Sequence, residues 1–282
     1  MDIEIICPYE NALKYIDEMK NGSNADPQLL WDKYFIQPYW DRISQWAPFD
    51  QSFMKPAMIE DLDALEQQFH LLAKINADDL KSEFRRICRE LPKNDDDPII
   101  VAIYPNTNGL VKERQNGVVG ACVFGNILIN VNPRAENWEQ WIPYVFGHEY
   151  HHSVWGHHWY VLNGGLEGNF LEYIINEGQA DAFAKSLFPD LQPQWLSVLT
   201  RSEETDLWDK MKPILYSTDR DDFEKYMFGD EKIGLPWCIG YTFGNLVVNS
   251  YLDLHPHVSL TELIAVHPKE ILNGSIYRLH AY

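Results

Sequence analysis

The sequence predicts an α+β fold that is mostly helical, with a small antiparallel or mixed β-sheet packed on a pair of helices. Apolar residues recur at steps of three and four along most of the 282 residues, which is the period of amphipathic helices. Three runs rich in β-branched residues gather between positions 99 and 131. Apolar residues make up 45% of the chain and charged residues 23%, which is a normal balance for a folded protein.

Residues 1–95 form the predicted helical N-terminal region. A one-sided apolar stripe is clearest at Met58, Leu62, Leu65, Phe69 and Leu72. The charged, proline-bounded segment 92–98 then breaks the helical pattern, so we expect a second domain over residues 96–282. The helices expected before this break are Ala12–Lys20, Asp26–Ser44, Pro56–Ile75 and Ala77–Leu91.

The second domain opens with the predicted sheet. Ile99–Tyr104 reads as a buried strand that ends at Pro105. Val118–Phe124 and Ile127–Val131 follow, and the two residues Gly125 and Asn126 between them are typical of a tight hairpin.

The rest of the second domain is predicted to be helical. Pro143 has no backbone N–H, so the first of these helices either begins near it or kinks there. The expected helices are Asn137–Trp155, Leu166–Phe188, Glu203–Leu215, Asp221–Phe228, Cys238–Leu254 and Leu260–Val266.

The charge and the cysteine pattern limit the partners and the compartment. A formal net charge of −19 repels phosphate backbones and anionic lipid surfaces, so we expect neither nucleic acid nor membrane partners. The first six residues carry acids where a secretory signal carries Lys or Arg. The four cysteines lie far apart, which is typical of reduced thiols in a cytoplasmic protein. No feature of the sequence indicates an oligomeric state.

The most informative motif is His148-Glu149-x-x-His152, which lies in a predicted helix. Positions four apart share one helix face, so the two imidazoles can bind one Zn²⁺ ion. Glu149 is rotated by about 100° from His148, which is the place of a general base beside the metal. The pair His148 and His151 is an alternative, but it leaves His152 and the position of the base unexplained.

A second motif, Asn176-Glu177-Gly178-Gln179-Ala180-Asp181, lies in the next predicted helix. Glu177 can supply the third protein ligand that a catalytic zinc needs, if this helix packs beside the first. Asp181 is four residues further on and can accept a hydrogen bond from a ligand imidazole. The small residues Gly178 and Ala180 suit two closely packed helices. Considered alone, Glu177 and Asp181 are also compatible with a solvated helix face.

The two motifs together resemble the gluzincin metallopeptidases, whose members include thermolysin-like enzymes. From about Ile99 onwards the chain resembles more closely the YjaZ-like family of predicted zinc-dependent proteases. This resemblance also includes the segments Ile239–Gly244 and Leu260–Leu263. It implies a zincin-type pair of active-site helices in a metallopeptidase domain over residues 96–282.

The resemblance implies a role for each motif residue. His148, His152 and Glu177 are the expected zinc ligands, and Glu149 is the expected base and proton shuttle. Asp181 is expected to accept a hydrogen bond from the His148 imidazole, and Asn176 to brace the other ring.

A tetrahedral oxyanion also needs a hydrogen-bond donor besides the metal. Tyr241 is our candidate, because its small neighbours allow a phenol to reach a cleft, although a core tyrosine fits the same sequence equally well. The resemblance also implies that a peptide or protein substrate pairs with an edge strand, either Val118–Phe124 or Ile127–Val131.

The predicted function is therefore hydrolysis of peptide bonds by a zinc-bound water that Glu149 activates. Two alternatives use the same motif. One is a catalytically silent protein that binds zinc and peptides, although such a protein has no use for Glu149 as a base. The other is a zinc hydrolase that acts on a non-peptide amide.

Overall fold

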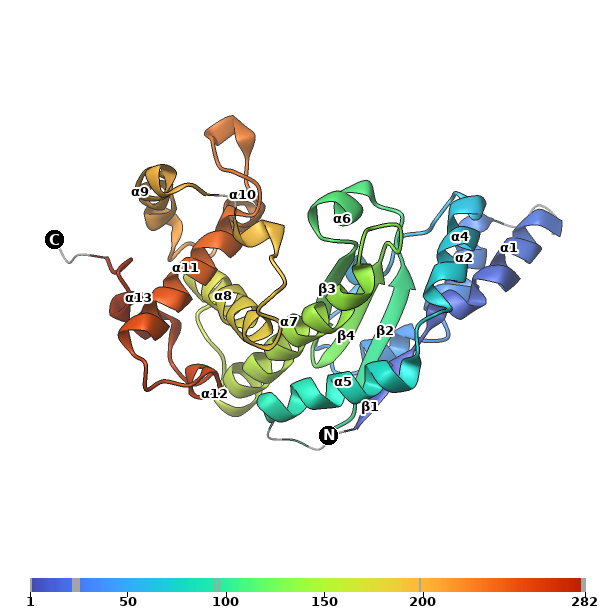
Figure 1. Ribbon diagram of the computed structural model, residues 1–282, viewed down its shortest axis with the longest axis horizontal. Coiled ribbons are helices and arrows are strands. Elements are labelled where there is room, and N and C mark those ends of the chain that lie inside the picture. The colour runs from blue at the N-terminus through green and yellow to red at the C-terminus, as the bar shows by residue number, and fades with distance from the viewer. Residues whose placement is uncertain (1, 22–25, 94, 96, 198, 280–282) are drawn as a thin grey trace. The chain divides into compact units, whose positions relative to one another are not determined.

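The computed structural model describes residues 2–21, 26–93, 95, 97–197 and 199–279 (Figure 1). Contacts divide the chain into two compact units, residues 1–153 and 154–282. The predicted mostly helical α+β fold with a small mixed sheet is confirmed. The division of the chain into an N-terminal region and a metallopeptidase domain at residue 95 stays a prediction.

The first unit contains a four-stranded mixed sheet. Its order is β1-β2-β4-β3, in which β1, β2 and β4 are parallel and β3 is antiparallel to β4. β3 therefore forms one edge of the sheet. The sequence analysis missed β1, whose Ile3 aligns with Ile99 of β2. The strands are β1 (Ile3–Ile6), β2 (Ile99–Pro105), β3 (Val118–Val123) and β4 (Asn126–Val131).

The predicted hairpin is present, but its turn lies one residue earlier than expected. Phe124 and Gly125 form the turn, with φ angles of 48° and 111°, the left-handed region that such tight turns require. Asn126 is the first residue of β4, and its buried side chain is held by hydrogen bonds to β2 and to helix α3 (Trp40–Ile43). It accepts a hydrogen bond from Ile100 N and donates to the carbonyls of Arg42 and Ile43.

Helices cover both faces of this sheet (Figure 1). On one face, side chains of β2 and β4 such as Tyr104 and Leu128 pack in a core with Trp31 and Phe35. On the other face, Phe84 of α5 stacks on a ring of α7 at a centroid distance of 3.9 Å. The helices of this unit are α1 (Ala12–Asn21), α2 (Pro27–Trp31), α3 (Trp40–Ile43), α4 (Leu62–Leu72), α5 (Ala77–Glu90), α6 (Gly109–Arg114) and α7 (Trp141–Gly156), which runs three residues past residue 153.

Two of the predicted N-terminal helices are shorter than expected. The segment 26–44 is not one helix, because it contains a π-helical stretch, Asp32–Ile36, and then a turn around Pro38, which has no N–H to donate. The helix predicted from Pro56 begins only at Leu62, where the side chain of Asp61 caps it by accepting from Ala64 N. The sequence analysis also missed α6 and α13, which are both short.

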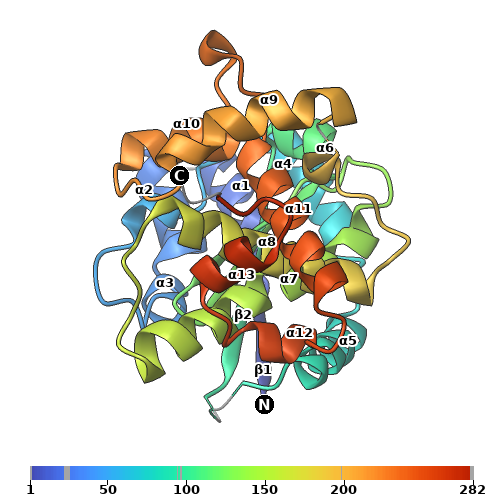
Figure 2. The ribbon, with the colours of Figure 1, turned by 90° about the vertical axis from the view of Figure 1, so that its left-hand side faces the viewer.

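The second unit is helical, and α8 and α11 form its centre. Figure 2 shows α13 lying over these two helices. Their apolar faces bury a cluster that includes Ile174, Phe243 and Val247. The helices of this unit are α8 (Phe170–Leu187), α9 (Arg201–Met211), α10 (Arg220–Phe228), α11 (Ile239–Leu254), α12 (Leu260–Leu263) and α13 (Pro268–Gly274).

Among the described residues, no helix combines the length and the hydropathy that crossing a bilayer requires.

Candidate metal centre

Helix α7 carries the first motif, and its sequence explains where it begins. Pro143 is the third residue of the helix, in the first turn, where the missing N–H leaves no intrahelical hydrogen bond unmade. The prediction that the helix begins near Pro143 is therefore confirmed. His148 and Glu149 are both buried, with 8% and 7% of their surface exposed, and His152 is half-buried.

Helix α8 carries the second motif and has a well-defined start. The side chain of Asn169 accepts from Glu172 N, and the carboxylate of Glu172 accepts from Asn169 N, which is a complete capping box. Two turns further on, Glu177 is 6% exposed. The capping box thus sets the start of α8 at Phe170, and Glu177 is the eighth residue of the helix.

The position of α8 depends on a glycine contact with α11. A Cβ atom at Gly178 would overlap the carbonyl group of Gly244 and lie 2.9 Å from Asn245 N. A Cβ atom at Gly244 would in turn overlap the carbonyl oxygen of Ile174. The two helices approach this closely only because neither residue has a side chain. A small residue is therefore needed at 178, but the helix that packs there is α11 and not the helix of the first motif, as the sequence analysis expected.

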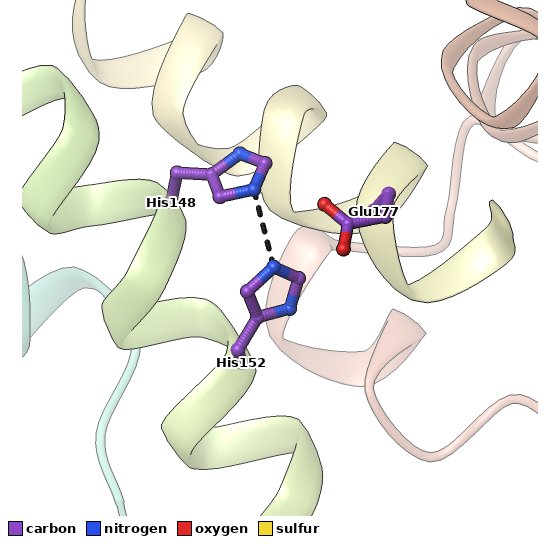
Figure 3. A group of neighbouring side chains, drawn as sticks. All are labelled: His148, His152 and Glu177. Atoms are coloured by element: carbon purple, nitrogen blue, oxygen red, sulfur yellow. Dashed lines mark hydrogen bonds between the residues drawn. The ribbon is translucent and has the colours of Figure 1, made fainter. Parts of the chain in front are cut away.

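His148, His152 and Glu177 form one compact group of potential metal ligands (Figure 3). One ligand atom from each residue lies within 4.8 Å of the other two. The Nε2 atoms of the two imidazoles are 3.1 Å apart. Two histidine nitrogens on one tetrahedral Zn²⁺ ion, each at about 2.0–2.1 Å, are separated by about 3.3 Å. The spacing of the imidazoles therefore fits zinc.

The chemistry of the donor set also fits zinc. Two imidazoles and one carboxylate form the set that catalytic zinc sites use when they keep a further position for water or substrate. Burial favours metal binding as well, because the attraction between a carboxylate and a nearby cation is stronger away from water than in it. His151, the alternative ligand, is also buried but does not belong to this group.

Asp181 lies one turn after Glu177 on α8 and is fully buried. Its two carboxylate oxygens accept from Trp195 Nε1 at 3.2 and 3.3 Å. The carbonyl of Trp195 accepts from Thr242 Oγ1 on α11 at 2.8 Å, so Trp195 connects Asp181 to the start of that helix. The sequence analysis missed Trp195, which lies in a short 3-10 helix, Gln194–Leu196, outside the predicted elements. Its only sequence signal is an indole N–H that needs an acceptor. The expected hydrogen bond from His148 to Asp181 stays a prediction.

The two remaining predicted site residues are half-buried. Tyr241, in the first turn of α11, packs against the core of the second unit, and its ring centroid is 6.1 Å from that of Phe228. Asn176 precedes Glu177 on α8. The expected roles of Tyr241 as an oxyanion donor and of Asn176 as a brace for an imidazole stay predictions.

Comparison with known proteins identifies a family. Residues 77–273 match the family model described as "Predicted Zn-dependent protease (DUF2268)". The matched segment begins at the first residue of α5 and contains β2, β3 and β4 together with α7, α8 and α11. It includes all three members of the ligand group. No curated protein and no solved structure gives a significant match.

Proposed function

The chain belongs to the family of predicted Zn-dependent proteases, and from this premise we propose that it is a zinc metallopeptidase of the gluzincin type. The proposal depends on one observation above all. His148 and His152 from α7 and Glu177 from α8 bring their ligand atoms within 4.8 Å of one another, and Glu149 lies beside them in the same helix. A purely structural zinc site has no use for such a carboxylate.

His148, His152 and Glu177 would hold the zinc ion. When bound at such a site, zinc polarises a carbonyl group and lowers the pKa of a coordinated water to about 7. The three ligands come from two helices, the two imidazoles from α7 and the carboxylate from α8. Asp181 would accept a hydrogen bond from the His148 ring, and Asn176 would brace His152, so that each ring presents Nε2.

Glu149 would act as the general base and then as the proton shuttle. Its carboxylate accepts the proton of the attacking water and delivers it to the nitrogen of the leaving amine. The surroundings suit this task, because the side chain is 7% exposed and bulk water has little access to it. Tyr241 would donate a hydrogen bond from its phenol to the oxyanion that forms on the scissile carbonyl.

Strand β3 would bind the substrate backbone. It lies at the end of the strand order, and among the described residues no strand pairs with its second edge. An extended peptide can add to such an edge by main-chain hydrogen bonds. Of the two strands considered from the sequence, β4 lies between β2 and β3, so only β3 can serve. We therefore propose a peptide or protein substrate. From the net charge and the cysteine pattern we also propose that the enzyme is cytoplasmic and has no nucleic acid or membrane partners.

The substitution Glu149→Gln tests the proposal. It keeps the size of the side chain but removes the base, so we expect zinc binding to persist and cleavage of a peptide library to fall at least a hundredfold. Wild-type protein that binds zinc and a peptide without cleaving it would indicate a binding protein instead. Cleavage of small amides but not of peptides would indicate a different hydrolase.

A further inference from the structure

Helix α7 and strand β3 run side by side, and a regular stripe of α7 contacts the hairpin. Val145, Glu149 and Ser153 are spaced by four residues, so they share one helix face over about 12 Å. Val145 and Glu149 lie against Gly120 of β3, and Ser153 Oγ donates to Gly125 O in the turn at 3.3 Å. Glu149, the proposed base, therefore lies on the face of α7 that contacts the hairpin.

Gly120 is the point of closest approach in this stripe. A Cβ atom built on Gly120 would overlap Cγ of Glu149, and it would lie 2.7 Å from both Glu149 Oε1 and Val145 Cγ1. Real side chains essentially never approach this closely. The side chain of Glu149 therefore occupies the volume that any other residue at position 120 would fill.

The backbone gives no reason for a glycine at this position. Gly117 and Gly125 at the two ends of β3 have φ angles of 83° and 111°, where glycine is favoured, whereas Gly120 has no such angle. A glycine in the middle of a strand also weakens it, because it has no side chain to pack and loses more conformational freedom on folding. The missing side chain is explained by the space that Glu149 needs.

We propose that Gly120 is a positioning residue for Glu149, and that its lack of a side chain creates the slot that holds the carboxylate against the edge strand β3. This inference rests on the proposed function insofar as it concerns catalysis. The slot itself is a packing property of the chain, so it can be tested without any activity.

The packing is tested by a double-mutant cycle on metal-free protein. Gly120→Ala, Glu149→Ala and the double variant are compared in a Val145→Ala background, which removes the Val145 contact from all four proteins. We expect Gly120→Ala to lower the Tm by roughly 4–8 °C while Glu149 is present. We expect most of this fall in Tm to disappear when Glu149→Ala is also present. The proposal would be overturned if Gly120→Ala lowered the Tm equally with and without Glu149→Ala.

The positioning role is tested by comparing zinc content and turnover in Gly120→Ala. The three atoms nearest to the new methyl group belong to Glu149 and Val145 and not to a zinc ligand, so we expect one zinc per chain and a kcat lowered at least tenfold. Gly109→Ala is the matched control, because among the described residues no atom lies within 4 Å of a Cβ there. Full kcat in Gly120→Ala, or loss of zinc together with activity, would overturn the proposal. An inactive wild type would instead refute the proposed function, and the thermal cycle would still test the slot.

Discussion

The glycine contact between α8 and α11 makes Gly178→Ala an informative substitution. To bring the new Cβ from 2.9 Å to ordinary van der Waals contact at 3.4 Å from Asn245 N, the helices must separate by about 0.5 Å. The overlap with the Gly244 carbonyl demands still more, and both neighbours are backbone atoms that cannot rotate away. Overpacking of this kind costs about 3 kcal/mol, against about 1 kcal/mol gained from the helix propensity of alanine. We expect a net loss of about 2 kcal/mol.

Gly156→Ala provides the matched control for this prediction. Gly156 has helical backbone angles of −61° and −41°, and a Cβ there would meet no atom of the described residues within 4 Å. The same change should therefore stabilise the protein by about 0.5–1 kcal/mol. The assay is urea unfolding of metal-free protein followed by helical circular dichroism. If Gly178→Ala stabilises the chain as Gly156→Ala does, the argument for the close helix contact is wrong.

Three further predictions concern the sheet, the pH and the metal. Asn126→Ala removes three hydrogen bonds, two buried and one partly buried, and leaves their backbone partners unsatisfied, so we expect urea unfolding to show a loss of about 3 kcal/mol. Burial raises the pKa of the Cys88 thiol from 9.0 to about 12, so the native state keeps a proton that the unfolded chain loses. The free energy of unfolding should therefore fall from pH 9 towards pH 12 by up to about 1.4 kcal/mol per pH unit, and Cys88→Ala should show a shallower fall in urea midpoints. Zinc at 100 times its Kd should raise the free energy of unfolding by about 2.7 kcal/mol, a Tm increase that His152→Ala should not show.

The group of three potential metal ligands could be predicted from the sequence because its signals are local. The spacing of His148 and His152 requires only a helix, and Pro143 marks where that helix begins. The turn of the hairpin was placed one residue too late because Asn126 resembles a turn residue. Its side chain instead bonds to Ile100 and to the segment near Ile43, and no local pattern reveals such partners.

The features that the sequence analysis missed depend on residues far apart in the chain. β1 is only four residues long and becomes a strand because it pairs with β2. Trp195 bonds to Asp181 from a three-residue 3-10 helix. The slot at Gly120 appears only when α7 is placed against β3, because a strand glycine by itself indicates nothing about the residue that lies above it.

The central claim is that His148, His152 and Glu177 bind one zinc ion. The most direct measurement is elemental analysis of protein purified without added metal or a histidine tag, with wild type compared with Glu177→Ala. We predict close to one zinc per chain in the wild type and little in the variant, with both proteins folded by circular dichroism. Wild-type protein that contains no zinc, even after reconstitution, or a variant that retains all of it, would contradict the account.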